Sequence, residues 1–307
     1  MEKSIAICKP PRLKRGGTIG VVATAGCVDA DSLSRGINVL KKQGFEIALS
    51  PRIHERKGYL AGDERQRARD LQEFFQRPDI DAIFCARGGF GSIQLLPHLN
   101  VEAIRSNPKI FVGCSDVTIL LNWVLQHCGI VTLHGPMVAM EFARGVDGRT
   151  KEYFWQTILG EKESWETKLT TTIQPGIVEA PMVGGCLSLL VTTLGTPYEI
   201  DTGGKLLFLE DVGEKPYRIE RMLTHLKMAG KLDRLAGLVF GDFIQCEPEG
   251  PRGIMQIITE MFRDAPYPVL MGLAAGHGEE NLTLPFGVKM ALDGHTGTLS
   301  LLESPVT

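Results

Sequence analysis

The sequence predicts a two-domain α/β protein, in which an N-terminal doubly wound parallel-sheet domain precedes a smaller mixed α+β domain. The chain has 307 residues, more than the roughly 100–200 of one domain. Short β-branched apolar runs alternate with helical patterns through the first half, and this alternation stops after about residue 141. We therefore expect a first domain over 1–160, a polar linker over 161–176 and a second domain over 177–307.

Strands and helices alternate in the first half. Its apolar runs, which we expect to be strands, are 18–25, 45–49, 80–86, 110–114 and 130–134. Between them, we expect a helix capped by Asp29 or Asp31 and ended by Gly44, then helices over 63–76 and from 116 to about 127. Continuous apolar strands of this kind are typical of a parallel sheet covered on both faces.

The second half has a mixed pattern. A helix that runs to about Leu159 is followed by the polar stretch expected to be the linker. Beyond it, the expected strands are 205–210, 238–243 and 268–272, and the expected helices are 217–228 and 254–262. Residues 288–292 and 298–302, joined by an Asp-Gly turn, predict a closing hairpin.

Composition excludes several classes of protein. The net charge of −3, without a basic stripe, argues against a nucleic-acid partner, and no apolar run approaches the ~20 residues that span a membrane. The seven cysteines are scattered without a C-x-x-C pair, which favours buried free thiols in a cytoplasmic, reducing compartment. No Cys/His pair has ligand spacing, so we expect neither a metal nor another cofactor.

One stretch near the N-terminus has a second interpretation. Thr24-Ala25-Gly26-Cys27 loosely resembles a lipoprotein cleavage box and follows a basic segment, Lys9–Arg15. The apolar stretch before it is short, and Gly16-Gly17 interrupts its start. We therefore interpret 18–25 as the first strand rather than as a processing signal.

Four segments follow expected parallel strands and should meet at one sheet edge, where open sheets bind ligands: 24–26, 87–91, 114–116 and 134–136. Ser115 lies between a strand and a helix, as a nucleophile on a sharp turn does, and the N–H of Asp116 would then be free to stabilise an oxyanion. Gly113 suits such a turn, whereas Val117 stands where the motif prefers glycine. The alternative is that Ser115 or Asp116 only caps the helix.

The glycine-rich segment Arg87-Gly88-Gly89-Phe90-Gly91 also has several interpretations. It could cradle a phosphate, but it lacks the spacing of the dinucleotide and P-loop motifs. It could be a plain turn. A third interpretation is that Gly88 or Gly89 supplies a second oxyanion N–H beside Ser115.

A serine nucleophile needs a base and a group that orients the base. Among the seven histidines, His127 and His225 lie in helical patterns, whereas His134 and the glycine-flanked His277 are candidate bases. Glu210 ends an apolar strand, where a carboxylate needs a partner, and Asp211 and Glu214 are its competitors. From the residues alone, a hydrolase and a two-domain binding protein remain equally open.

At these residues the sequence resembles the LD-carboxypeptidase family of serine peptidases, over nearly the whole chain. The matching segments are Tyr59–Gly62, Arg87–Gly91, Gly113–Asp116, His134–Pro136, Gly184-Gly185, Leu209–Glu214, Pro216–Arg218 and Gly276–Gly278. The resemblance implies a flavodoxin-like or class I amidotransferase-like first domain, and cytoplasmic removal of the terminal D-alanine from murein tetrapeptides during cell-wall recycling.

The resemblance also assigns roles. Ser115 would be the nucleophile, Glu210 the orienting carboxylate and His277 the base. Asp116 and one glycine, which we take as Gly89, would supply the oxyanion N–H groups. The order Ser, Glu, His crosses the expected linker, so the triad would assemble only when the domains meet.

Some questions stay open. Cys114 departs mildly from the family pattern and leaves a cysteine-dependent amidotransferase as an alternative. The family's other branch, which cleaves acylated amino-acid nucleotides for self-immunity, is the nearest rival, although no inserted loop favours it. Candidates for binding the substrate are Gly88, Arg87, Arg218 and Arg221. A homodimer is possible.

Overall fold

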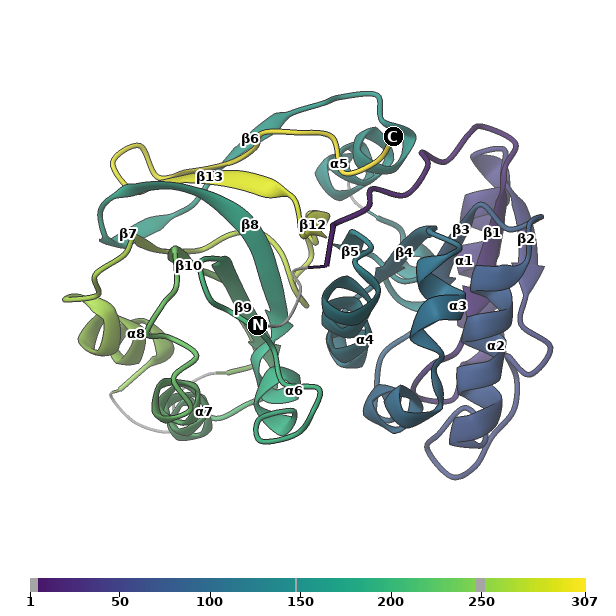
Figure 1. Ribbon diagram of the computed structural model, residues 1–307, viewed down its shortest axis with the longest axis horizontal. Helices are drawn as coiled ribbons and strands as arrows, with labels where there is room; N and C mark the ends of the chain where they lie inside the picture. Colours follow the sequence, from purple (N-terminus) through teal and green to yellow (C-terminus); the bar gives the residue numbers. More distant parts are fainter. Residues whose placement is uncertain (1–4, 147, 247–251) are drawn as a thin grey trace. The chain divides into compact units, whose positions relative to one another are not determined.

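The computed structural model describes residues 5–146, 148–246 and 252–307, and the chain forms two compact units (Figure 1). The first unit holds residues 1–161 together with two later segments, 282–285 and 305–307. The second unit holds residues 162–281 and 286–304. The chain therefore contributes to the first unit again after it has built most of the second.

The first unit contains a six-stranded sheet in the order β12-β5-β4-β3-β1-β2. Its strands are β1 (Thr18–Val22), β2 (Glu46–Leu49), β3 (Ala82–Cys85), β4 (Ile110–Gly113), β5 (Thr132–His134) and β12 (Leu284–Phe286). The five strands from β1 to β5 pair in parallel, which confirms the predicted parallel sheet. Their order, 2-1-3-4-5, is that of flavodoxin-like folds.

Helices cover both faces of this sheet, as predicted. They are α1 (Ala30–Lys42), α2 (Glu64–Gln76), η1 (Ser92–His98), α3 (Val101–Arg105), η2 (Ser115–Val117), α4 (Thr118–Trp123), η3 (Val124–Cys128), η4 (Val138–Phe142) and α5 (Gly148–Leu159). On one face, Phe84 of β3 packs against Phe142 and Phe154. On the other, Phe74 of α2 lies so close to Gly20 that a Cβ there would be 2.5 Å from its ring.

The capping residues of the first two long helices agree with the sequence. Asp29 accepts the N–H of Ser32 at 2.9 Å and caps α1. Asp63 accepts the N–H of Arg65 at 3.0 Å and caps α2. The helix expected over 116–127 is instead three consecutive segments, η2, α4 and the π-helical η3, which follow the residue of positive φ, Ser115.

The second unit contains an eight-stranded mixed sheet in the order β6-β14-β13-β8-β9-β10-β11-β7. Its strands are β6 (Trp165–Lys168), β7 (Thr171–Gln174), β8 (Ile177–Cys186), β9 (Leu206–Val212), β10 (Gly237–Ile244), β11 (Val269–Met271), β13 (Lys289–Asp293) and β14 (Thr298–Leu301). The pairs from β8 to β11 are parallel and the remaining pairs are antiparallel. With α6 (Leu187–Thr192), α7 (Pro216–Met228) and α8 (Ile254–Phe262), this is the expected α+β architecture (Figure 1).

The structure differs from the sequence prediction around the expected linker. Residues 161–176 include β6 and β7, which form the two outer strands of the second sheet. Outer strands are partly exposed and tolerate polar residues. The polar, threonine-rich composition of 161–176 therefore predicts a loop, although part of this stretch forms strands. The expected second domain, 177–307, also differs, since 282–285 and 305–307 belong to the first unit.

Two expectations about composition can be compared with the structure. All seven cysteines are free, and five of them are buried, whereas Cys8 is exposed and Cys27 is partly exposed. None of the described helices is both long enough and apolar enough to cross a bilayer.

Candidate active site

Ser115 occupies a strained turn in the first unit. Strand β4 ends at Gly113 and η2 begins at Ser115, whose φ is +60°. A positive φ is uncommon for a residue with a side chain and is a form of strain that clusters at functional sites. Gly113 makes the turn possible, because a Cβ there would lie 2.5 Å from the side chain of Val117. Val117 therefore fills the space that glycine leaves at Gly113.

The glycine-rich segment lies directly against this turn. A Cβ on Gly88 would be 2.7 Å from Cβ of Ser115, 2.8 Å from its Oγ and 3.3 Å from the backbone N of Asp116. The N–H of Gly26 donates to the carbonyl of Gly88 at 3.2 Å, and that of Gly135 donates to Gly113 at 3.0 Å. The four segments expected at one sheet edge are therefore neighbours.

Asp116 does not cap the helix that follows it. Its buried carboxylate accepts the N–H of Ser92 at 2.8 Å, so it fixes the end of the glycine-rich segment. Burial raises the pKa of Asp116, while hydrogen bonds from Ser92 and Gly91 and the charge of Arg67 oppose that increase. The N-cap position of η2 is Cys114, which makes no side-chain capping bond. The capping interpretation of Ser115 and Asp116 is therefore wrong.

Arg67 is a supporting residue that the sequence analysis missed. Its guanidinium is buried and donates to the carbonyls of Thr24 at 2.5 Å and Gly91 at 3.0 Å, and to Oε1 of Gln94 at 2.8 Å. It thereby joins the loop after β1 to the loop after β3. Arg67 lies in the helix expected over 63–76, and no local pattern distinguishes a buried arginine from an exposed one.

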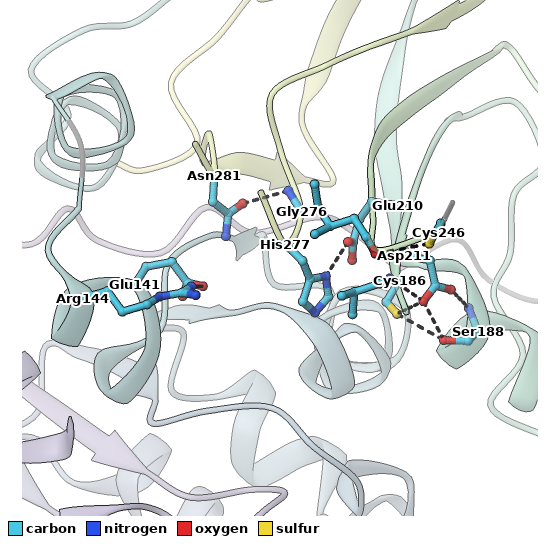
Figure 2. Close-up of polar contacts among 12 residues, drawn as sticks. Glu141, Arg144, Cys186, Ser188, Glu210, Asp211, Cys246, Gly276, His277 and Asn281 are labelled. Atoms are coloured by element: carbon cyan, nitrogen blue, oxygen red, sulfur yellow. Dashed lines mark hydrogen bonds and ion pairs between the residues drawn. The ribbon is translucent and has the colours of Figure 1, made fainter. Parts of the chain in front are cut away.

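In the second unit, His277 and Glu210 form a hydrogen-bonded pair, which confirms their expected contact (Figure 2). Nδ1 of His277 is 2.6 Å from Oε2 of Glu210, and the glutamate side chain is fully buried whereas the histidine side chain is 19% exposed. The flanking Gly276 is needed here, because its φ is +127° and a Cβ would be 2.6 Å from Oε2 of Glu210. Its N–H donates to Oδ1 of Asn281 at 3.1 Å.

The competing acids have other partners. Asp211 accepts the N–H of Ser188 at 2.7 Å, at the start of α6 (Figure 2). Glu214 pairs with the exposed Arg218 at 3.5 Å. Of these three carboxylates, Glu210 is therefore the one in contact with His277.

His127, His134 and His225 each lie within a helix or a strand. His134 is fully buried in β5, where it pairs in register with Gly113, and the ring of His127 lies 5.6 Å from that of Trp123. His225 lies in the last turn of α7. The contact between His277 and Glu210 favours His277 over His134 as the base.

The arginine candidates differ in their surroundings. In the first unit, Arg87 is partly buried and donates to the carbonyls of Gly88 at 3.2 Å and Cys27 at 3.3 Å. In the second unit, Arg218 lies in the first turns of α7 with about half of its side chain exposed, and Arg221 stacks on Tyr217 at 5.4 Å.

A strained serine after a flavodoxin-like strand, and a histidine hydrogen-bonded to a buried carboxylate, are the kinds of groups that serine-type hydrolases use. The chain belongs to the LD-carboxypeptidase family: residues 19–135 match the model of the LD-carboxypeptidase N-terminal domain, and residues 179–292 match that of the C-terminal domain. The protein is accordingly a serine-type carboxypeptidase.

Relatives of known name cover almost the whole chain. A Bacillus subtilis (strain 168) protein named "Probable murein peptide carboxypeptidase" is 39% identical over 291 residues, which cover 93% of this chain and 91% of that protein. The crystal structure of muramoyltetrapeptide carboxypeptidase from Oxalobacter formigenes is 31% identical, with a TM-score of 0.83, and the match covers 92% of this chain and 97% of that one.

A relative with a different role is similarly close in fold. The Escherichia coli microcin C7 self-immunity protein MccF is 29% identical over 323 residues, which cover 94% of each chain. Its wild-type structure has a TM-score of 0.91 at 25% identity, with 98% of this chain and all of that chain covered. The fold alone therefore does not separate murein peptidases from this self-immunity protein.

Proposed function

We propose that this carboxypeptidase releases the terminal D-alanine from murein tetrapeptide by cleaving the bond that follows the L-centre of the diamino acid. The hydrogen bond between the buried Glu210 and the partly exposed His277 is the observation that supports this chemistry, because it orients the ring of a base. The substrate class is supported by the names of the murein peptide and muramoyltetrapeptide carboxypeptidases among the relatives.

In the proposed reaction, Oγ of Ser115 attacks the carbonyl carbon of the penultimate residue and His277 takes its proton. The nitrogen that does this is Nε2, since Nδ1 faces Glu210. The N–H groups of Asp116 and Gly89 hold the oxyanion. The C–N bond then breaks, and His277 gives the proton to the leaving amine of D-alanine.

The second half of the reaction repeats these roles with water. His277 removes a proton from a water molecule that attacks the acyl-enzyme ester, and the proton returns to Oγ of Ser115 as the ester bond breaks. Glu210 remains charged throughout, because its role is to hold the ring and to stabilise the imidazolium.

A second candidate function is hydrolysis of an acylated amino-acid nucleotide, favoured by the similarity to MccF. The two candidates place different groups on the two sides of the scissile bond, while the serine chemistry is the same. A non-catalytic solute-binding role and a cysteine-dependent amidotransferase are weaker, since the family is one of serine-type carboxypeptidases.

The deciding experiment compares three substrates. The enzyme is incubated with murein tetrapeptide, with the same peptide ending in L-alanine, and with an aminoacylated nucleotide, and Ser115→Ala serves as the control. We expect loss of one alanine by mass from the D-alanine peptide alone, because inverting the leaving residue displaces its carboxylate, and even ~1 Å of misplacement can cost about 100-fold. Equal rates on the two peptides would contradict the proposed stereospecificity, and cleavage of the nucleotide alone would favour the self-immunity type.

The proposal extends to the substrate's terminal carboxylate and to the cellular setting. Arg87, Arg218 and Arg221 are the candidates for the carboxylate, since a guanidinium binds two oxygens at once. An Arg→Lys change at the true site raises KM more than it lowers kcat, whereas the same change at the other two sites leaves KM unchanged. We further propose that the enzyme acts on recycled fragments in the cytoplasm, which fractionation of cells would test.

A further inference from the structure

Strand β10 contains a bulge opposite Glu210. Leu209 of β9 pairs with Phe240 of β10, but Asp211 pairs with Phe243, so two residues of β10, Gly241 and Asp242, stand opposite the single residue Glu210. Bulges re-aim side chains and are over-represented next to active sites. This bulge places an acid, Asp242, on the strand beside the one that carries the glutamate.

Asp242 holds the loop of His277 at two points. Its backbone N–H donates to the carbonyl of Ala275 at 3.0 Å. Its carboxylate accepts a hydrogen bond from the N–H of Gly278, and the contact is so close that a Cβ on Gly278 would be 2.3 Å from Oδ2. The two anchors lie on either side of His277, two residues before it and one residue after it.

The carboxylate of Asp242 is also electrostatically coupled to the pair beside it. Burial, the charge of Glu210 and then that of Glu280 raise the pKa of Asp242 to about 6, while His277 opposes the increase. Glu210 faces it from β9, and Glu280 and His277 face it from the loop, whereas β11 on the other side of β10 carries no charged residue. The imidazole thus experiences Asp242 as a negative charge beyond that of its partner Glu210.

We propose that Asp242 is a positioning residue for His277, which fixes the loop that carries the ring and stabilises the imidazolium through its negative charge. The proposal rests on the proposed function for its catalytic consequence, although the contacts themselves do not depend on the substrate. A merely structural carboxylate would hold the loop without affecting the titration of the imidazole.

The test uses two variants and a matched control. Asp242→Asn keeps an oxygen that can accept the N–H of Gly278 but removes the charge, whereas Asp242→Ala removes both. Glu279→Gln removes an exposed negative charge from the same loop and leaves the contacts of Asp242 in place. The His277 ring is followed by NMR across pH, with its signals assigned from the spectrum of His277→Ala, and kcat and KM are measured on murein tetrapeptide.

We expect the pKa of His277 to fall in both Asp242 variants and to stay close to its wild-type value in Glu279→Gln. We expect kcat to fall about 100-fold in Asp242→Ala, as displacement of a catalytic group by ~1 Å can produce, with KM within about twofold. Asp242→Asn should show a smaller loss, because the loop anchor remains. Thermal unfolding shows whether each variant folds. If Asp242→Ala does not fold, the proposal is tested with Asp242→Asn, which alters the fewest atoms.

An unchanged His277 titration, together with kcat within about twofold of wild type in a folded Asp242→Asn protein, would overturn this proposal. Failure of the proposed function has a different signature. If the wild-type enzyme does not cleave tetrapeptide but Asp242→Asn still lowers the pKa of His277, the coupling between the two residues stands and only the substrate assignment is lost.

Discussion

Nδ1 of His277 lies 2.6 Å from Oε2 of Glu210, whose side chain has no exposed surface. Burial of a carboxylate costs free energy unless the group has a partner. The histidine therefore offsets the cost of burying Glu210, while Glu210 orients the histidine ring. The direction of the bond also leaves Nε2 as the ring nitrogen available for chemistry.

Glu210→Gln should therefore reduce kcat strongly while the protein still folds. The amide can donate to Nδ1 and hold the ring in the wrong tautomer, and in serine triads this kind of change costs about 10⁴-fold. Steady-state kinetics measures the loss. The control is Glu214→Gln, which removes a carboxylate paired with the exposed Arg218 and should change kcat little. Equal effects of the two changes would contradict the role of Glu210.

Ser115→Ala should abolish hydrolysis, because loss of a triad nucleophile costs on the order of 10⁶ in kcat. A fluorophosphonate probe should label the wild-type enzyme and Cys114→Ala but leave Ser115→Ala unlabelled. The cysteine control removes the neighbouring buried thiol and keeps the hydroxyl. Retention of more than a few per cent of turnover in Ser115→Ala, or loss of labelling in Cys114→Ala, would show that the nucleophile has been misassigned.

Gly88→Ala should lower kcat strongly, whereas the midpoint of thermal unfolding should change little. The added methyl would lie 2.7 Å from Cβ of Ser115 and 2.8 Å from its Oγ, so the turn or the loop must move. The matched control is Gly148→Ala in α5, where the new methyl meets nothing within 4 Å. Kinetics and thermal unfolding of both variants check the prediction, and a fully active Gly88→Ala enzyme would show that the loop is not held against Ser115.

Stability should respond to pH through Asp242. Because the folded-state pKa is raised from 3.8 to about 6, the folded chain binds more protons than the unfolded chain between these values. The contribution of Asp242 to stability therefore falls as pH rises through this window. Asp242→Asn should raise the midpoint of thermal unfolding relative to wild type at pH 8 but not at pH 3.5. A difference that is the same at both pH values would contradict the linkage.

The sequence is informative where a local pattern determines the structure. The alternation of apolar runs and helices predicts the parallel sheet, and Asp29 and Asp63 mark helix starts that the structure reproduces. The turn at Ser115 is visible because a strand, a small residue and a helix follow one another within a few positions.

The supporting residues were not predictable in this way. Arg67 joins loops that are distant in sequence, and Asp242 faces Glu210 because of a one-residue register shift between strands. Neither depends on a pattern within its own element. The edge strand β7 was missed for the opposite reason, since its local composition is that of a loop and its pairing with β11 makes it a strand.

The return of residues 282–285 to the first unit affects how the chain is made. The β5 side of the first sheet is completed by β12, so its outer backbone groups stay unpaired until residue 286 has left the ribosome. An open sheet edge invites pairing with other chains. A nascent or truncated polypeptide that stops after residue 161 would therefore expose an unpaired, aggregation-prone strand edge. Its folding would depend more on chaperones than the folding of a domain formed from one continuous segment.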